Sequence, residues 1–430
     1  MRKALLFALS FILLFSVFSF SASAKDDLDT VTLNVYNWGQ YISDGEDDLP
    51  DTNALFEEYF NTYLAKSYGY YIEVNYSTYP SNEDMYNKIV SGSASFDVIT
   101  PSDYMIERMI AEGLLLPLDF ELIPNISNID EKFFTEYNTY DPEAKYSVPY
   151  TYSMVGIIYN TEYVDEEDIG SWDLLWNEKY AGKILQFNNP RDAFGTALYY
   201  LGDSVNTTDH AKWNTALDLL KRQKPLVQAY VMDEIFNKMI SASAYVAPYY
   251  SGDYFTMYDS NDSLSFYYPE EGTNFFVDAM CIPTCARNPE AAHAYIDFML
   301  QEEAAVANAM YIGYGSPNTV VRENEDYIEY MNDWHEEALE ILYGKEVIID
   351  DYTDLKDIDT DKIKTSFYRS ISNTEENGNL LDYTNDLWSK LKSESSTELW
   401  IIVTDIVIVA SLLFSVIFFA VRKHIRAKDY

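Results

Sequence analysis

The sequence VTLNVYN at residues 31–37 alternates apolar and polar side chains, which predicts a β-strand. A run with helical spacing follows at 53–68, and YYIEVNYSTY at 70–79 predicts the next strand. SNEDMYNKIV at 81–90 predicts a helix capped by its first serine, and FDVIT at 96–100 predicts a short buried strand. Strands that alternate with helices are typical of a mostly parallel sheet with helices on both faces, so the expected fold class is α/β.

The same alternation continues to about residue 340. It predicts strands at 155–159, 183–187 and 244–249, and helices at 104–112, 172–176, 193–201, 210–222 and 291–309. The polar, acidic residues 344–380 predict no firm element, and residues 381–398 predict a last helix with a short stalk. A chain of 430 residues is too long for one small domain and suits two lobes, each with a sizeable core.

The N-terminus has the features of a secretory signal peptide over residues 1–24. Two basic residues come first, the apolar stretch 5–20 follows, and the sequence at 22–24 fits an A-x-A cleavage site. No cysteine lies near that site, which excludes a lipoprotein signal. An uncleaved membrane anchor is the alternative, and in either case the residues that follow are exported.

A second apolar run, residues 399–421, has the length that a helix needs to cross a bilayer. Residues 422–430 follow it with four basic side chains, which mark a cytoplasmic tail by the positive-inside rule. We therefore expect a single-pass protein of the cell membrane, with one C-terminal transmembrane helix and an exported body. A buried core helix is the alternative, which the length of the run and its basic flank disfavour.

The composition is strongly acidic. The chain contains 29 Lys and Arg against 70 Asp and Glu, a formal net charge of −41. Such a field repels nucleic acid and attracts cations. Solubility or adaptation to the medium explains the same charge, so the charge alone does not identify a ligand.

Motifs that carry catalysis or bind cofactors are missing from the sequence. The four His are scattered, and there is no H-E-x-x-H, C-x-x-C, G-x-S-x-G, Walker loop or G-x-G-x-x-G. We therefore expect no enzyme, no cofactor and no metal site. The two cysteines, Cys281 and Cys285, could close one small disulfide loop or remain free thiols.

Eight blocks of sequence, in order along roughly residues 30–320, resemble the spermidine/putrescine-binding proteins. They are YNWGQY (36–41), YSTYPSNEDMYNKI (76–89), FDVITPSDYMIERM (96–109), YSVPYTYSMVGIIYN (146–160), SWDLLWNEKYAGKI (171–184), NNPRDAFGTAL (188–198), YYPEEGTNFFVDAMCIP (267–283) and IGYGSPN (312–318). Each block alone is a weak signal, but together and in order they identify the chain as a member of that family.

The resemblance implies a two-lobed, periplasmic-binding-protein-like fold of type II, in which crossing strands join two α/β lobes and a ligand lies between them. On this sequence the first lobe would take residues 25–145 and 278–330, and the second 146–277 and 331–395. The implied function is to bind spermidine or putrescine in the extracellular or periplasmic space and deliver it for import. The implied partners are a polyamine ligand, the subunits of an ABC permease and, through them, a cytoplasmic ATPase.

Carried over residue by residue, the resemblance places nine side chains in the cleft: Trp38, Tyr41, Ser102, Tyr104, Asp192, Tyr250, Phe276, Asp278 and Tyr314. Aromatic faces suit the methylenes and ammonium groups of a polyamine. Carboxylates accept charge-assisted hydrogen bonds from its ends, so Asp192 and Asp278 are the expected anchors. No counterpart of the family's C-terminal polar contact is found in the sequence.

The site departs from the family pattern at four positions. Tyr250 and Phe276 stand where relatives often have Trp, and the amides Gln40 and Asn189 stand where several have acids. The positions carried over from the family include two carboxylates, Asp192 and Asp278. Two negative charges match the charge of a diamine, which slightly favours putrescine.

Other interpretations of the same residues remain open. Asp192 could cap the helix that begins near Ala193, Asp278 could pair with a nearby cation, and Trp38 and the tyrosines could belong to the core. A membrane-anchored sensor or adhesin could use the same cleft, although the short tail leaves no room for a signalling domain. A binding protein for an amino acid, sugar or metal is the third possibility. An amino acid calls for an Arg in the cleft, and we expect Arg191 to be structural.

Overall fold

The computed structural model describes residues 28–46, 48–344, 347–349 and 362–393. The predicted signal peptide (1–24), transmembrane helix (399–421) and cytoplasmic tail (422–430) lie outside these ranges. Within them, no helix combines the length and the apolar character that a membrane crossing needs.

The strands of the described residues form one mixed sheet, in the order β2-β1-β3-β9-β4-β7-β5-β6, with β8 paired to β4 and the pair β10–β11 attached to β9. Their bounds are β1 Asp29–Trp38, β2 Tyr70–Tyr79, β3 Val98–Ile99, β4 Ser147–Asn160, β5 Ile184–Phe187, β6 Val227–Val231, β7 Val246–Tyr250, β8 Leu264–Tyr267, β9 Thr273–Cys281, β10 Val347–Ile349 and β11 Ile363–Ser366.

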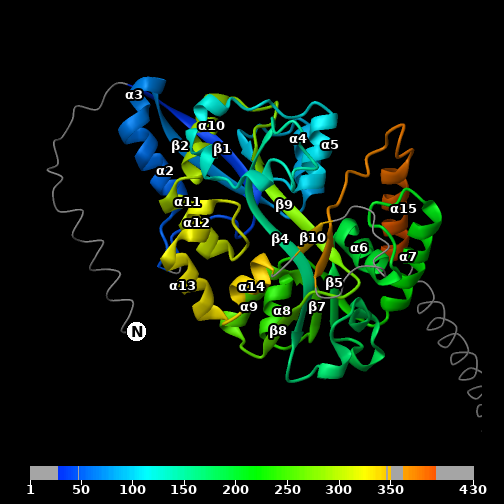
Figure 1. Ribbon diagram of the computed structural model, residues 1–430. Helices are drawn as coiled ribbons and strands as arrows, with labels where there is room; N and C mark the ends of the chain where they lie inside the picture. The colour runs from blue at the N-terminus through cyan, green and yellow to red at the C-terminus, as the bar shows by residue number, and fades with distance from the viewer. Residues whose placement is uncertain (1–27, 47, 345–346, 350–361, 394–430) are drawn as a thin grey trace, which may run out of the picture.

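Two lobes lie at the two ends of this sheet, and β4 and β9 run between them (Figure 1). The first lobe holds β1, β2 and β3, which pair in parallel, and the second holds β5, β6 and β7, where β5 pairs in parallel with each neighbour. β4 and β9 are antiparallel to each other and buried along their whole length. The expected two-lobed α/β fold is therefore confirmed, with its antiparallel pairs at the crossing strands.

Helices flank both ends of the sheet (Figure 1). Their bounds are α2 Thr52–Tyr59, α3 Ala65–Tyr68, α4 Asn82–Val90, α5 Asp103–Ala111, α6 Pro190–Leu201, α7 His210–Gln223, α8 Glu234–Ile240, α9 Ser251–Ser260, α10 Pro289–Met299, α11 Glu302–Ile312, α12 Thr319–Glu323, α13 Glu325–Trp334, α14 Ala338–Tyr343 and α15 Leu380–Ser393, with a π-helical turn η1 at Phe60–Leu64. The short 3₁₀ helices are η2 Phe120–Leu122, η3 Pro124–Asn128, η4 Glu131–Phe133, η5 Glu166–Asp168, η6 Trp172–Trp176 and η7 Glu178–Tyr180.

Several sequence predictions are confirmed closely, and three need correction. The strand at 70–79 is correct to the residue, and Ser81 caps α4 by accepting a hydrogen bond from the Asp84 N–H at 3.1 Å. The prediction of a single helix over 291–309 is wrong, because α10 ends at Met299 and a separate helix, α11, begins at Glu302. The strand at 155–159 is only the second half of β4, and part of the segment 344–380 forms β10 and β11.

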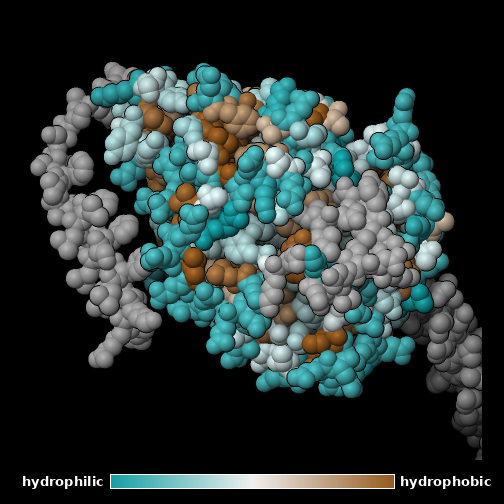
Figure 2. Space-filling model, viewed as in Figure 1, coloured by the Kyte–Doolittle hydropathy of each residue, from teal (hydrophilic) through white to brown (hydrophobic). Residues whose placement is uncertain are grey.

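The outer surface on the face drawn in Figure 2 is dominated by hydrophilic side chains, with small hydrophobic areas between them. This agrees with the acidic composition. The two cysteines are free thiols: Cys281 is buried in β9 and Cys285 is partly buried. Of the two alternatives left by the sequence, the structure has the unpaired one.

Candidate functional site

All nine side chains expected in the cleft line one pocket between the lobes. The first lobe contributes the loop after β1 and the first turns of α4 and α5, and the second contributes the starts of α6 and α9. β9, the start of α8, the end of α11 and the segment after β11 also line the pocket. Gln40 and Asn189 also line it. The fold thus gathers residues that are far apart in sequence, and their role as ligand contacts stays a prediction.

Asp278, on β9, is the buried carboxylate at the first-lobe end of the pocket. Its Oδ2 accepts a short hydrogen bond from the Tyr41 hydroxyl, which also lies 2.7 Å from the Thr151 hydroxyl. Its Oδ1 is buried and has no hydrogen-bond partner among the described residues. Burial raises the pKa of Asp278 to about 6, and the neighbouring hydroxyls of Ser102 and Tyr41 oppose that rise.

Asp192, in the first turn of α6, is the carboxylate at the second-lobe end. Its Oδ2 accepts hydrogen bonds from the Asn189 amide at 2.6 Å and the Tyr250 hydroxyl at 2.8 Å. Burial raises the pKa of Asp192, and the hydrogen bonds from Asn189, Tyr250 and a further tyrosine, Tyr368, oppose the rise. Asn189 caps α6 by accepting the Asp192 N–H at 2.8 Å, so Asp192 is not the cap.

Trp38 is held at the pocket edge by a hydrogen bond of 3.0 Å from its indole N–H to the Thr100 carbonyl. Its ring packs against Tyr79 with 4.7 Å between ring centroids. The side chain is only half-buried, so it is not a core residue. The polar part of the indole is satisfied within the protein, which leaves ring surface for the pocket.

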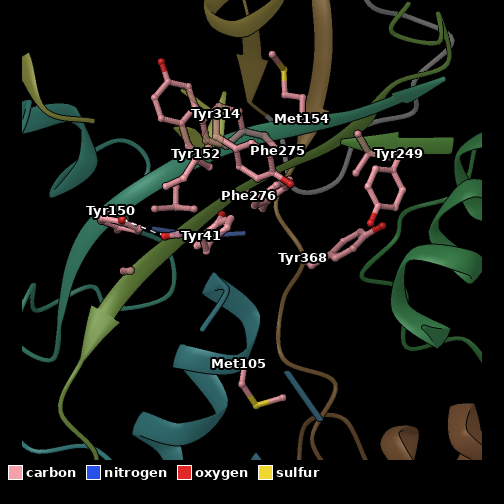
Figure 3. Close-up of a cluster of buried hydrophobic side chains, with 14 of the residues drawn as sticks. Tyr41, Met105, Tyr150, Tyr152, Met154, Tyr249, Phe275, Phe276, Tyr314 and Tyr368 are labelled. Atoms are coloured by element: carbon pink, nitrogen blue, oxygen red, sulfur yellow. Dashed lines mark hydrogen bonds between the residues drawn. The ribbon is translucent and has the colours of Figure 1, made fainter. Parts of the chain in front are cut away.

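The remaining aromatic side chains form a connected wall with edge-to-face geometry. Phe276 lies 5.3 Å from Tyr250 and 6.1 Å from Tyr314, and Tyr314 lies 5.5 Å from Tyr41, all between ring centroids. In Figure 3, Tyr41 lies on one side of the cluster and Tyr368 on the other. Such a wall offers an apolar lining for alkyl groups and ring faces for cations.

Sequence reasoning missed several polar residues of the lining. Asp253 on α9 accepts a hydrogen bond from the Tyr314 hydroxyl at 2.7 Å, and burial raises its pKa to about 7. Glu83 on α4 accepts one from the Tyr104 hydroxyl at 3.1 Å, and burial raises its pKa too. Asp233 lines the pocket from the second lobe. Glu83 lies within the block 76–89 that resembles the family, and Asp253 lies three residues after Tyr250. The sequence around each residue could therefore have pointed to it.

The pocket as a whole is acidic. Six carboxyl groups line it, from Glu83, Asp103, Asp192, Asp233, Asp253 and Asp278, and none of its lining residues is Lys or Arg. No group of three or more His, Cys, Asp or Glu in the described ranges is arranged to hold a metal ion. The chemistry of the lining favours an organic cation with apolar segments.

Comparisons with known proteins identify the family of the chain. A family model described as bacterial extracellular solute-binding protein matches residues 58–335. The spermidine/putrescine-binding periplasmic protein of Escherichia coli is 33% identical over 304 residues, which covers 70% of this chain and 82% of that protein. The putrescine-binding periplasmic protein PotF of Escherichia coli is 28% identical over 304 residues, covering 67% and 78%.

Solved structures extend the likeness to the fold. A putative spermidine/putrescine ABC transporter protein from Listeria monocytogenes is 33% identical with a TM-score of 0.68, covering 84% of this chain and 99% of that one. The spermidine/putrescine ABC transporter substrate-binding protein PotD from Streptococcus pneumoniae is 31% identical with a TM-score of 0.61, covering 84% and 98%. The chain therefore belongs to the bacterial extracellular solute-binding proteins, a family of transporter components and not of enzymes, and within it to the spermidine/putrescine-binding group.

Proposed function

We propose that this protein binds polyamines, spermidine or putrescine, outside the membrane and delivers them to an ABC permease, which a cytoplasmic ATPase drives. The observation that carries the proposal is the composition of the pocket lining: six carboxyl groups and no Lys or Arg. The names of the relatives, which describe spermidine- or putrescine-binding transport proteins, point the same way.

A polyamine fits the lining in chemical terms. The ammonium ends would bind near Asp278 and Asp192, and the methylenes would lie against the rings of Trp38, Phe276 and Tyr314. Charge-assisted hydrogen bonds to carboxylates are about twice as strong as neutral ones. Closure of the two lobes around the ligand would exclude water and strengthen these contacts.

The choice between the two polyamines changes once the whole pocket is considered. Asp192 and Asp278 alone match a diamine, but Glu83, Asp233 and Asp253 also line the pocket. These additional carboxyl groups suit a third ammonium group, so the number of carboxylates no longer favours putrescine over spermidine. Calorimetric titration at physiological ionic strength with both ligands measures the preference directly, because low salt would favour the trication.

A thermal-shift screen of the full-length chain in mild detergent tests the proposal. Spermidine or putrescine at 100 times its Kd should add about 2.7 kcal/mol to the free energy of unfolding. Amino acids and sugars are the control ligands and should leave the melting temperature unchanged. A clear shift with another solute, together with none for either polyamine, contradicts the proposal.

The anchorage is a separate part of the proposal. Residues 399–421 would cross the membrane once and keep the two lobes, with the boundaries given above, outside the cell beside the permease. Truncation before Leu399 should release the protein into the medium, whereas the intact chain should sediment with membranes. Recovery of the intact chain in the soluble fraction without detergent would count against the span.

A further inference from the structure

The segment after β11, residues 366–372, lies across the two lobes, and we call it the strap. Its first residues are fixed to the second lobe. The Ser366 hydroxyl lies 2.6 Å from the Tyr199 hydroxyl on α6. The Asn206 amide donates to the Phe367 carbonyl at 2.7 Å and its oxygen accepts the Arg369 N–H at 2.9 Å. These bonds give the strap a defined register on the second lobe.

Tyr368 turns from the strap into the ligand pocket. It is buried and lines the pocket, and its hydroxyl opposes the rise in the pKa of Asp192. The fit against α6 is tight, because a Cβ added at Gly195 would lie 2.1 Å from the Tyr368 hydroxyl oxygen. The Arg191 guanidinium lies over the Tyr368 ring at 4.4 Å and donates to the Arg369 carbonyl at 3.1 Å. Arg191 on α6 therefore has the structural role that was expected, because it supports the strap.

Arg369, the next residue, reaches the first lobe. Its Nη2 lies 2.6 Å from Oε1 of Glu107 on α5, and its Nε lies 3.2 Å from the same oxygen. The Ser370 N–H donates to the other oxygen, Oε2, at 2.6 Å. α5 begins with Asp103 and Tyr104, which line the pocket. Adjacent residues of the strap thus touch the pocket and tie the first lobe to the second.

The part of the chain that follows the strap packs on the second lobe and fixes the C-terminal end of the strap there. α15 packs against α7, with Leu387 and Leu391 buried. The Tyr383 ring stacks on His210 at 3.9 Å between centroids. Because the strap is anchored at both of its ends to the second lobe, opening of the cleft would have to break its bonds to Glu107.

We infer that Arg369 and Glu107 form a latch that holds the two lobes closed over the bound ligand and sets how long the ligand stays. The pair acts on the lobes and not on the ligand, so both are positioning residues. Opening would break the ion pair and the Ser370 N–H bond together. The identity of the ligand in this inference rests on the proposed function, but the latch itself does not.

Dissociation kinetics of spermidine from the full-length chain, measured by stopped flow, test the latch. Arg369→Gln and Glu107→Gln should each speed dissociation about threefold to fivefold, as expected for a partly exposed ion pair, and leave the association rate unchanged. The double variant should dissociate no faster than either single variant, because the two side chains act as one pair.

The ion pair of Arg322 and Asp130 provides a matched control. Its exposed side-chain fractions, 28% and 24%, are close to the 34% and 24% of Arg369 and Glu107. Arg322 and Asp130 belong to segments already paired through the bridge between Ile129 and Asn318, so the pair does not join the lobes. Arg322→Gln and Asp130→Asn should leave the dissociation rate unchanged. An equal acceleration in these controls overturns the latch.

A measurement without ligand separates the latch from the proposed function. Fluorescence resonance energy transfer between a label on α2 and a label on α7 reports the separation of the lobes in the ligand-free protein. The latch variants should show a larger mean separation than the parent and the controls, whether or not any polyamine binds. Unchanged separation together with unchanged dissociation rates overturns the inference, whereas absence of polyamine binding with a changed separation overturns only the proposed ligand.

Discussion

The two carboxylates at the ends of the pocket differ in how completely the protein satisfies their oxygens. Asp192 accepts hydrogen bonds from the Asn189 amide and the Tyr250 hydroxyl on Oδ2, and neither of its oxygens is buried without a partner among the described residues. Asp278 has one oxygen that is buried without a partner among the described residues. A buried acceptor left unsatisfied costs roughly 1–3 kcal/mol. The difference suggests a division of labour: Asp192 organises the second-lobe wall, and Asp278 is the group that a ligand's ammonium would satisfy.

The largest effect should come from Asp278→Asn. The variant removes the charge that the ligand would pair with, so polyamine binding should weaken by about 1.5–3 kcal/mol, the range for a hydrogen bond to a charged group. Isothermal titration calorimetry against the parent measures this loss. The ligand-free variant should be at least as stable as the parent, because a neutral amide replaces a carboxylate that is buried with an unsatisfied oxygen. If the variant binds polyamines with the affinity of the parent, Asp278 does not anchor the ligand.

A smaller and different effect should come from Asp192→Asn. The new amide group would face the Asn189 and Tyr250 donors that now bind the carboxylate, which should lower the free energy of unfolding by about 1–2 kcal/mol. The loss of affinity should be smaller than for Asp278→Asn. Chemical denaturation and titration of both variants test the crossed pattern. The division of labour fails if Asp192→Asn costs more affinity than Asp278→Asn while its stability stays that of the parent.

The smallest effect should be a pH dependence of stability carried by Asp278. The pKa of Asp278 is raised to about 6 in the folded protein, whereas an unfolded Asp titrates near about 3.9. The folded protein therefore binds the proton more tightly, and stability falls as the pH rises from the unfolded pKa to the folded one. Between pH 5 and 7.5, as approximate limits, the ligand-free parent should lose about 1 kcal/mol relative to Asp278→Asn.

Ligand binding should respond to pH in the opposite direction. An ammonium group needs the ionised carboxylate, so affinity should fall as the pH drops below the pKa values of Asp253 and Asp278, about 7 and about 6. Denaturation without ligand and titration with ligand, each across this range, separate the two trends. A parent and an Asp278→Asn variant with parallel stability profiles would contradict the assignment of the pH effect to this residue.

Much of the fold could be predicted because its signals are local. The strand at 70–79 has its own alternation, and the cap at Ser81 is read from adjacent residues. The break between α10 and α11 has no such signal. The Leu300 carbonyl there accepts hydrogen bonds from the side chains of Asn128 and Asn318, at 3.1 and 3.0 Å. Amides from distant segments therefore help end α10, and the sequence of the helix itself does not show this.

The residues of the candidate site also fall into those with a local sequence signal and those placed by tertiary contacts. Eight of the nine predicted lining residues lie in blocks that resemble a family, so each could be carried over by its neighbours in sequence, and Tyr250 lies outside these blocks. Tyr368 lies in the acidic segment 344–380, where no periodicity predicted an element. Its position depends on its contacts with α6 and on the hydrogen bonds between the strap and Asn206. Only the folded chain brings these residues together. Residues placed by tertiary contacts alone were beyond the reach of the sequence.

The crossing strands also determine the order in which the chain can fold. β3 pairs with β9 at Ile99 and Cys281, and the strands of the second lobe lie between these two strands in sequence. The first lobe thus has an unfinished sheet edge until most of the chain is available. Contacts of such large sequence separation slow folding. A newly made chain therefore cannot complete the sheet of its first lobe until β9, near residue 280, has been added.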